Sequence, residues 1–113
     1  MKKKEIRVRC WIAIEGEKFF GPGPAELLQL IGDKGSIAKA AKAMGMSYKK
    51  GWDIIDHLNE KGQRPYVLSH KGGKKAGGAE LTEVRKSVVD EYGRLIATIN
   101  ATVAKNIQIL RLI

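Results

Sequence analysis

Apolar and polar residues alternate near the start of the chain, over residues 5–15. A two-residue period rich in β-branched side chains predicts a strand that is buried on one face. The residues expected on its apolar face are Ile6, Val8, Cys10, Ile12 and Ile14. We therefore expect one half-buried strand at the N-terminal end.

A first helix is predicted after a break of alternating glycine and proline at residues 21–24. Pro24 suits the first helical position, because proline lacks the N–H that would be unpaired there. The glycine-rich stretch 32–35 ends the helix. Its apolar face consists of Leu27, Leu28 and Ile31.

Two further helices are predicted, with a tight turn between them. Ser36 can cap a helix from Ile37 to Met44, and Gly45 supplies the turn. Ser47 can cap the next helix, which runs to about Lys61. The stripe expected to be buried on this third helix is Trp52, Ile55 and Leu58, with Gly51 at a close contact.

A hairpin and a long helix complete the pattern. Strands are predicted at Tyr66–Ser69 and Glu80–Thr82, on either side of a glycine- and lysine-rich loop, and Thr82 opens the final helix. Apolar residues then recur at alternating steps of four and three, which is one stripe of an amphipathic helix. The stripe is Val84, Val88, Tyr92, Leu95, Ile99, Val103, Ile107 and Leu110.

Three short helices followed by a hairpin are typical of a winged helix-turn-helix. A chain of 113 residues fits one domain. We therefore predict a single α+β domain over residues 1–113, with an N-terminal strand, a two-stranded wing and a long C-terminal helix.

Charge changes this picture by pointing to a partner. The formal net charge is +9, and residues 34–75 hold ten Lys or Arg against three acidic residues. Such a balance favours a polyanion, either nucleic acid or an anionic membrane surface. The strongly amphipathic helix lies in the nearly neutral C-terminal third, and no apolar run approaches the length of a membrane span. Double-stranded DNA is therefore the expected partner, and a membrane is not.

Two parts of the basic region have the chemistry for this partner. The third helix begins with hydroxyl and lysine side chains that can reach base edges or phosphates. The glycines of the loop allow close backbone approach, and its lysines can meet phosphates. The candidate DNA-binding residues are Ser36, Ser47, Tyr48, Lys49, Lys50, Lys71, Gly72, Gly73, Lys74 and Lys75.

The run GSIAKAAKAMGMSYKKGWDIIDHLNE at residues 35–60, together with GGAELT at 77–82, resembles the DNA-binding domain of ModE-type molybdate-responsive transcription regulators. The motifs match over about residues 35–82, and the layout is similar over 22–110. The resemblance implies DNA binding and dimerisation. Gly51 stands where the family usually has alanine. Members that sense molybdate do so in a separate C-terminal domain, and we expect no molybdate-binding domain in this chain.

The final helix also predicts a homodimer. Its apolar stripe is longer than a small globule can cover, and a two-fold pair of helices would bury it. Residues 84–113 are therefore the expected dimerisation helix. The candidate contacts are Val88, Tyr92, Leu95, Ile96, Ile99, Val103, Ile107 and Leu110.

The remaining chemistry is sparse. Cys10 is the single cysteine, and the two histidines, His57 and His70, have no evident second ligand, so we expect no metal, no cofactor and no enzyme activity. With no export signal, a cytoplasmic, nucleoid-associated protein of a prokaryotic cell is expected. Two alternatives to a sequence-specific regulator remain open: a protein-interaction winged helix, and a low-specificity architectural nucleic-acid binder.

Overall fold

The computed structural model describes residues 2–69 and 79–113. A hairpin at the N-terminal end precedes three helices, a second hairpin and a long helix. In chain order the elements are β1 (Ile12–Ile14), β2 (Glu17–Phe20), α1 (Pro22–Lys34), α2 (Ile37–Ala43), α3 (Tyr48–Lys61), β3 (Val67–Ser69), β4 (Ala79–Leu81), α4 (Glu83–Lys105) and a short 3₁₀ helix (Ile107–Arg111). No described helix has the length and apolar character needed to cross a membrane.

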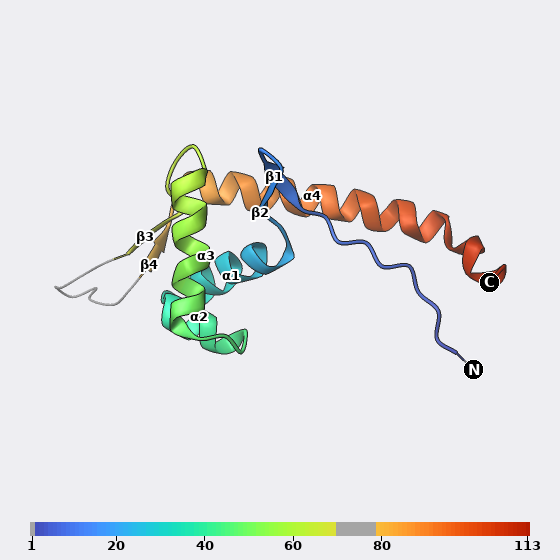
Figure 1. Cartoon of the computed structure of the whole chain (residues 1–113), viewed down its shortest axis with the longest axis horizontal. Coiled ribbons are helices and arrows are strands. Elements are labelled where there is room, and N and C mark those ends of the chain that lie inside the picture. The colour runs from blue at the N-terminus through green and yellow to red at the C-terminus, as the bar shows by residue number, and fades with distance from the viewer. Residues whose placement is uncertain (1, 70–78) are drawn as a thin grey trace.

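The helices are arranged around α3, which runs across the direction of α4 (Figure 1). α2 lies beside the start of α3, and α1 packs against both. The wing strands β3 and β4 lie on one side of α3, and the hairpin β1–β2 lies on the other (Figure 1). α3 is therefore flanked by two small antiparallel sheets.

Helix boundaries follow the predicted capping residues closely. The hydroxyl oxygen of Ser36 accepts from the backbone N–H of Lys39 at 3.3 Å, and that of Ser47 accepts from Lys50 at 3.0 Å. Thr82 caps α4 in the same way. α1 begins two residues earlier than predicted, at Pro22. Each cap pairs one of the amide groups that a helix start leaves without an intrahelical partner.

The prediction of one half-buried strand over residues 5–15 is wrong. The strand is only Ile12–Ile14, and it turns at Glu15–Gly16 into β2, which the sequence analysis missed. Both turn residues have positive φ, 51° and 82°, the pattern of a type I′ turn that joins twisted strands tightly. The burial lies on β2 at Phe19 and Phe20, while Ile12 and Ile14 are exposed.

The core is built from α1, α2, α3 and the ends of both hairpins. Its fully buried large side chains are Phe20, Leu27, Leu28, Ile31, Ile55 and Leu58. The predicted stripe of α3 is thus confirmed at Ile55 and Leu58, whereas Trp52 is only partly buried.

The pKa values of the Tyr66 and Tyr92 phenols are raised above their ordinary value of 10.0, mainly because both side chains are buried.

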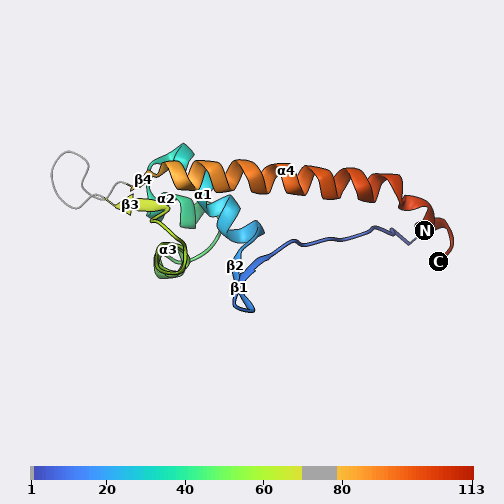
Figure 2. The ribbon, with the colours of Figure 1, turned by 90° about the horizontal axis from the view of Figure 1, so that it is seen from above.

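α4 joins this core only in its first half. The ring of Tyr92 meets Phe20 edge to face at 5.1 Å, and its hydroxyl donates to the backbone oxygen of Cys10 at 2.8 Å. Beyond Ile96 the helix extends away from the globule, and the extended residues 2–11 run toward the same end (Figure 2). The molecule is consequently 60 Å long, with a radius of gyration of 17.0 Å, against about 13 Å for a compact globule of this size.

The described base of the wing is tied to the helices. β3 and β4 pair antiparallel, with Val67 opposite Leu81 and Ser69 opposite Ala79. The N–H of Ala79 donates to Gly35 in the turn between α1 and α2, at 3.0 Å. The Thr82 hydroxyl donates to the backbone oxygen of Pro65 at 2.7 Å. The direction in which the wing leaves the domain is therefore fixed by these contacts.

Candidate nucleic-acid interface

The first turn of α3 presents two lysines to solvent. Lys49 and Lys50 are both exposed, as is Tyr48, whose side chain meets Trp52 edge to face at 6.2 Å. This first turn lies wholly within the described residues and contains no acidic side chain. Lysines here oppose the helix macrodipole, which prefers negative charge at an N-terminus by about 0.3–1 kcal/mol. Folding stability alone does not account for their placement.

α4 shows the opposite arrangement and serves as an internal comparison. It carries Glu83 in its first turn and Lys105 in its last, both in accord with the dipole. α3 differs from α4 at its first turn alone, since Lys61 lies in its last turn, and its two first-turn lysines concentrate positive potential at the helix start. A polyanion would meet two ammonium groups and the free N–H groups of the helix start together.

The acidic residues of α3 come later along the same outward side. Asp53, Asp56 and Glu60 are exposed and follow the lysines along the helix. The Lys49 ammonium lies 3.2 Å from the Asp53 carboxylate, and the two side chains remain 85% and 55% exposed. The outward side of α3 is thus positive at its first turn and acidic from Asp53 to Glu60, with Lys61 in the last turn, so a polyanion is most favoured at the first turn.

The predicted site serines have structural partners of their own. The oxygen of Ser36 caps α2 and that of Ser47 caps α3 by accepting backbone N–H groups. A hydroxyl that accepts a hydrogen bond still has its own proton to donate. Both serines remain able to donate to a phosphate oxygen.

The close packing of α2 on α3 depends on small residues. A Cβ added at Gly51 would lie 3.0 Å from the Cβ of Ala41 and 3.5 Å from Ile37. Ala40 and Ala41 are buried at this crossing, whereas Ala38 and Ala43 are exposed. The glycine therefore lets the two helices approach closely, which sets the angle at which α3 is presented.

Asn59 links α3 to the start of β3, and the sequence analysis missed this residue. Its side-chain oxygen accepts from the backbone N–H of Tyr66 at 2.7 Å and of Val67 at 3.3 Å. Its amide nitrogen donates back to the Val67 oxygen at 3.0 Å. The available signal was a polar amide near the predicted end of the third helix, a few residues before the predicted strand at Tyr66–Ser69.

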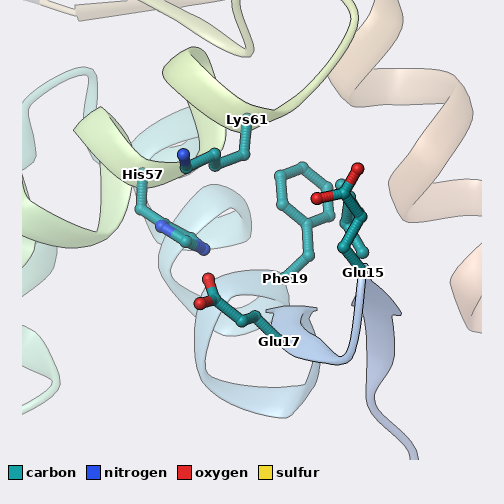
Figure 3. Close-up of a pocket in the computed structure, with 6 residues that line it drawn as sticks. Glu15, Glu17, Phe19, His57 and Lys61 are labelled. Atoms are coloured by element: carbon teal, nitrogen blue, oxygen red, sulfur yellow. The ribbon is translucent and has the colours of Figure 1, made fainter.

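The N-terminal hairpin supports α3 from the other side. Figure 3 shows the His57 ring projecting from α3 toward Glu17, with Phe19 beside it, while the Lys61 side chain lies along α3 on the side of His57. The ring nitrogen Nε2 of His57 lies 3.3 Å from the backbone oxygen of Lys18, and its ring lies 6.0 Å from that of Phe19. The hollow here measures about 180 Å³, below the range of about 300–1,000 Å³ for small-molecule sites. The contacts of His57 with Lys18 and Phe19 hold the hairpin against α3.

The predicted wing-tip residues Lys71, Gly72, Gly73, Lys74 and Lys75 lie outside the described residues. Only the base of the wing is described, beside the flank of α3 that carries Asn59. Contact between the wing-tip residues and DNA stays a prediction. Among residues 2–69 and 79–113, no group of three His, Cys, Asp or Glu side chains forms a metal site.

The predicted dimer residues fall into two groups. Tyr92 is buried in this chain's own core, and Val88 and Ile96 pack partly against it. Leu95 and Ile107 are exposed, and the side chains of Ile99, Val103 and Leu110 are partly exposed. Only the second group leaves substantial apolar surface uncovered within one chain.

Comparison with known proteins bears on this architecture. No protein-family model matches the chain. The transcriptional regulator ModE of Yersinia pestis is 36% identical over 95 residues, covering 84% of this chain and 36% of that protein. The molybdenum transport protein ModE of Azotobacter vinelandii is 41% identical over 69 residues, covering 61% of this chain and 26% of that protein.

The chain is homologous to the N-terminal region of ModE transcriptional regulators. It spans about a quarter to two-fifths of the length of the ModE relatives it matches. Among solved structures, the full-length LysR-type regulator LysG of Corynebacterium glutamicum superimposes with a TM-score of 0.58 at 22% identity, over 81% of this chain and 30% of that one. This likeness and the observed elements confirm the winged helix-turn-helix fold. In this fold, α2 and α3 form the helix-turn-helix, and β3 and β4 form the wing.

Proposed function

We propose that this chain binds duplex DNA sequence-specifically as a transcription regulator, with the first turn of α3 in the major groove. The observation that carries the proposal is the pair Lys49 and Lys50, exposed in the first turn of α3 against the helix dipole. Homology to the N-terminal region of ModE regulators supports it. The proposal covers DNA binding by this segment, and molybdenum binding is not part of it.

The contacts divide by chemistry. Tyr48 and Lys49 reach base edges, where lysine bonds guanine O6 and N7. Lys50 and the Ser36 and Ser47 hydroxyls hold phosphates, which fixes the register of the protein on the duplex. The wing lysines add phosphate contacts beside them. Base contacts and phosphate contacts should then respond differently to mutation and to salt.

The protein acts as a homodimer in this proposal. The apolar face beyond the core pairs with the same face of a second copy. It is made of Leu95, Ile99 and Val103 on α4, and of Ile107 and Leu110 on the 3₁₀ helix that follows. Residues near the C-terminal end add exposed apolar surface, with Leu112 82% exposed and Ile113 72% exposed. A two-fold pair would set two recognition helices on half-sites about one turn of DNA apart, or a multiple of it.

Titration of duplex DNA over a range of salt concentrations tests this function against its alternatives. The regulator retains a preference for duplexes selected from a random pool at moderate salt. Steep loss of affinity without any preference would instead identify an architectural binder. Absence of duplex binding at low salt would leave the protein-interaction winged helix as the better account.

A further inference from the structure

The ion pair between Lys49 and Asp53 has little value for folding. Both side chains are largely exposed, and exposed pairs at this helical spacing contribute about 0.3–0.5 kcal/mol at most. A lysine four residues before the acid is also the less favourable order along a helix. Stability therefore does not explain why a carboxylate stands directly beside the lysine of the first turn.

Asp53 is also costly for DNA binding of any general kind. It lies one turn from Lys49 on the exposed side of α3, where its carboxylate would approach the phosphates in the proposed complex. A negative charge there weakens attraction to every sequence alike. The presence of a carboxylate that weakens non-specific binding is explained if this carboxylate helps the protein to discriminate between DNA sequences.

The pair presents a donor and an acceptor at a spacing that a base pair can match. The Lys49 ammonium and the Asp53 oxygen Oδ2 are 3.2 Å apart. In the major groove a G·C pair presents the O6 acceptor of guanine beside the N4 amino donor of cytosine. Those two atoms are hydrogen-bonded to each other, which places them about 2.9 Å apart. The ammonium can meet O6 while the carboxylate meets the amino group.

We propose that Lys49 and Asp53 together read one G·C base pair, with Asp53 as the specificity-determining acceptor for the N4 amino group of cytosine. This inference rests on the proposed function. An A·T pair also offers an adjacent donor and acceptor, but its O4 acceptor is flanked by the thymine methyl group. That methyl group hinders a strongly hydrated ammonium, whereas guanine offers N7 as a second acceptor.

The experiment selects bound duplexes from a random pool with the wild-type protein, Asp53→Ala and Asp53→Asn. The wild-type motif is expected to contain a position fixed as G·C. Asp53→Ala should weaken the preference at that position, where Lys49 alone still favours guanine, and keep the others. Asp53→Asn should shift it toward adenine, because asparagine pairs with adenine N6 and N7. Discrimination at that position should fall by roughly 5- to 160-fold, the equivalent of about 1–3 kcal/mol.

Glu60→Gln is the matched control, since it removes the same charge from the same helix seven residues later, about 10 Å along the axis. Asp53→Ala should tighten binding to random duplexes more than Glu60→Gln does, and Glu60→Gln should leave the motif unchanged. A wild-type motif that Asp53→Ala retains at every position would overturn the inference. A wild-type protein that selects no motif would overturn the proposed function itself, which is a distinguishable result.

Discussion

Asn59 on α3 forms two hydrogen bonds with the backbone of Val67 on β3, one through each polar atom of its side-chain amide. The oxygen accepts the Val67 N–H at 3.3 Å, and the nitrogen donates to the Val67 carbonyl at 3.0 Å. Because the same oxygen also accepts from the backbone N–H of Tyr66, one side chain ties α3 to the base of the wing. The relative placement of α3 and the base of the wing is therefore set by contacts within this chain.

Asn59→Ala should destabilise the protein by about 1–3 kcal/mol, because it leaves part-buried backbone groups without partners. Urea unfolding measures the change. Glu60→Gln is an exposed neighbouring control and should stay within about 0.5 kcal/mol of the wild type. If both variants unfold at the same urea concentration, the amide does not support the wing in the way described.

Gly51 offers a test of how tightly α2 packs on α3. Replacing glycine by alanine inside a helix gains up to about 1 kcal/mol of propensity, but here the new Cβ would meet Ala41 at 3.0 Å. Gly51→Ala should therefore stabilise an Ala41→Gly background more than it stabilises the wild type. A double-mutant cycle by urea unfolding measures the difference. Equal effects in the two backgrounds would mean that the helices are not in close contact here.

The helix caps and the wing of this fold could be predicted from the sequence, and the N-terminal hairpin could not. Ser36, Ser47 and Thr82 cap helices by accepting hydrogen bonds from backbone N–H groups three residues later. Their role can therefore be predicted from the residues next to them in the sequence. The alternation over residues 5–15 carries no information about whether a partner sheet exists. The buried residues lie instead on β2, whose Phe19 packs against His57, a residue far away in the sequence.

The residues of the candidate site also separate into those that could be predicted from the sequence and those that could not. The exposed lysines of α3 followed from periodicity, because the buried stripe of the helix fixes which side faces outward. Asn59 could not be identified, since its partners lie beyond the break that ends α3. The Lys49–Asp53 pair has a common helical spacing, but only the structure shows the ammonium and the carboxylate in contact.

Replacement of Lys71, Lys74 and Lys75 by alanine should weaken binding to all duplexes alike. The slope of log affinity against log salt should become shallower by about 0.9 for each phosphate contact removed. Replacement of Lys2, Lys3 and Lys4 is the matched control, because these residues lie toward the end of the molecule away from α3 (Figure 1). A slope that stays unchanged in the wing variant would exclude the wing tip from the interface.

Sedimentation equilibrium at micromolar concentration should show a dimer of the 12.5 kDa chain. Ile99→Asp and Val103→Asp should each dissociate it, because each places a carboxylate in the apolar face of α4. Ala101→Asp adds the same charge at an exposed position away from this face and should leave the dimer intact. A wild-type monomer, or a dimer that survives both substitutions in the apolar face, would contradict the proposed assembly.

The central claim is that the first turn of α3 reads bases, and the most direct test compares affinities for a selected duplex and a random duplex. Lys49→Ala should lose about 1–3 kcal/mol on the selected duplex and much less on the random one. Lys61→Ala removes the same charge from the last turn of α3 and should affect both duplexes similarly and weakly. Equal loss on the two duplexes for Lys49→Ala would show that this turn only meets phosphates.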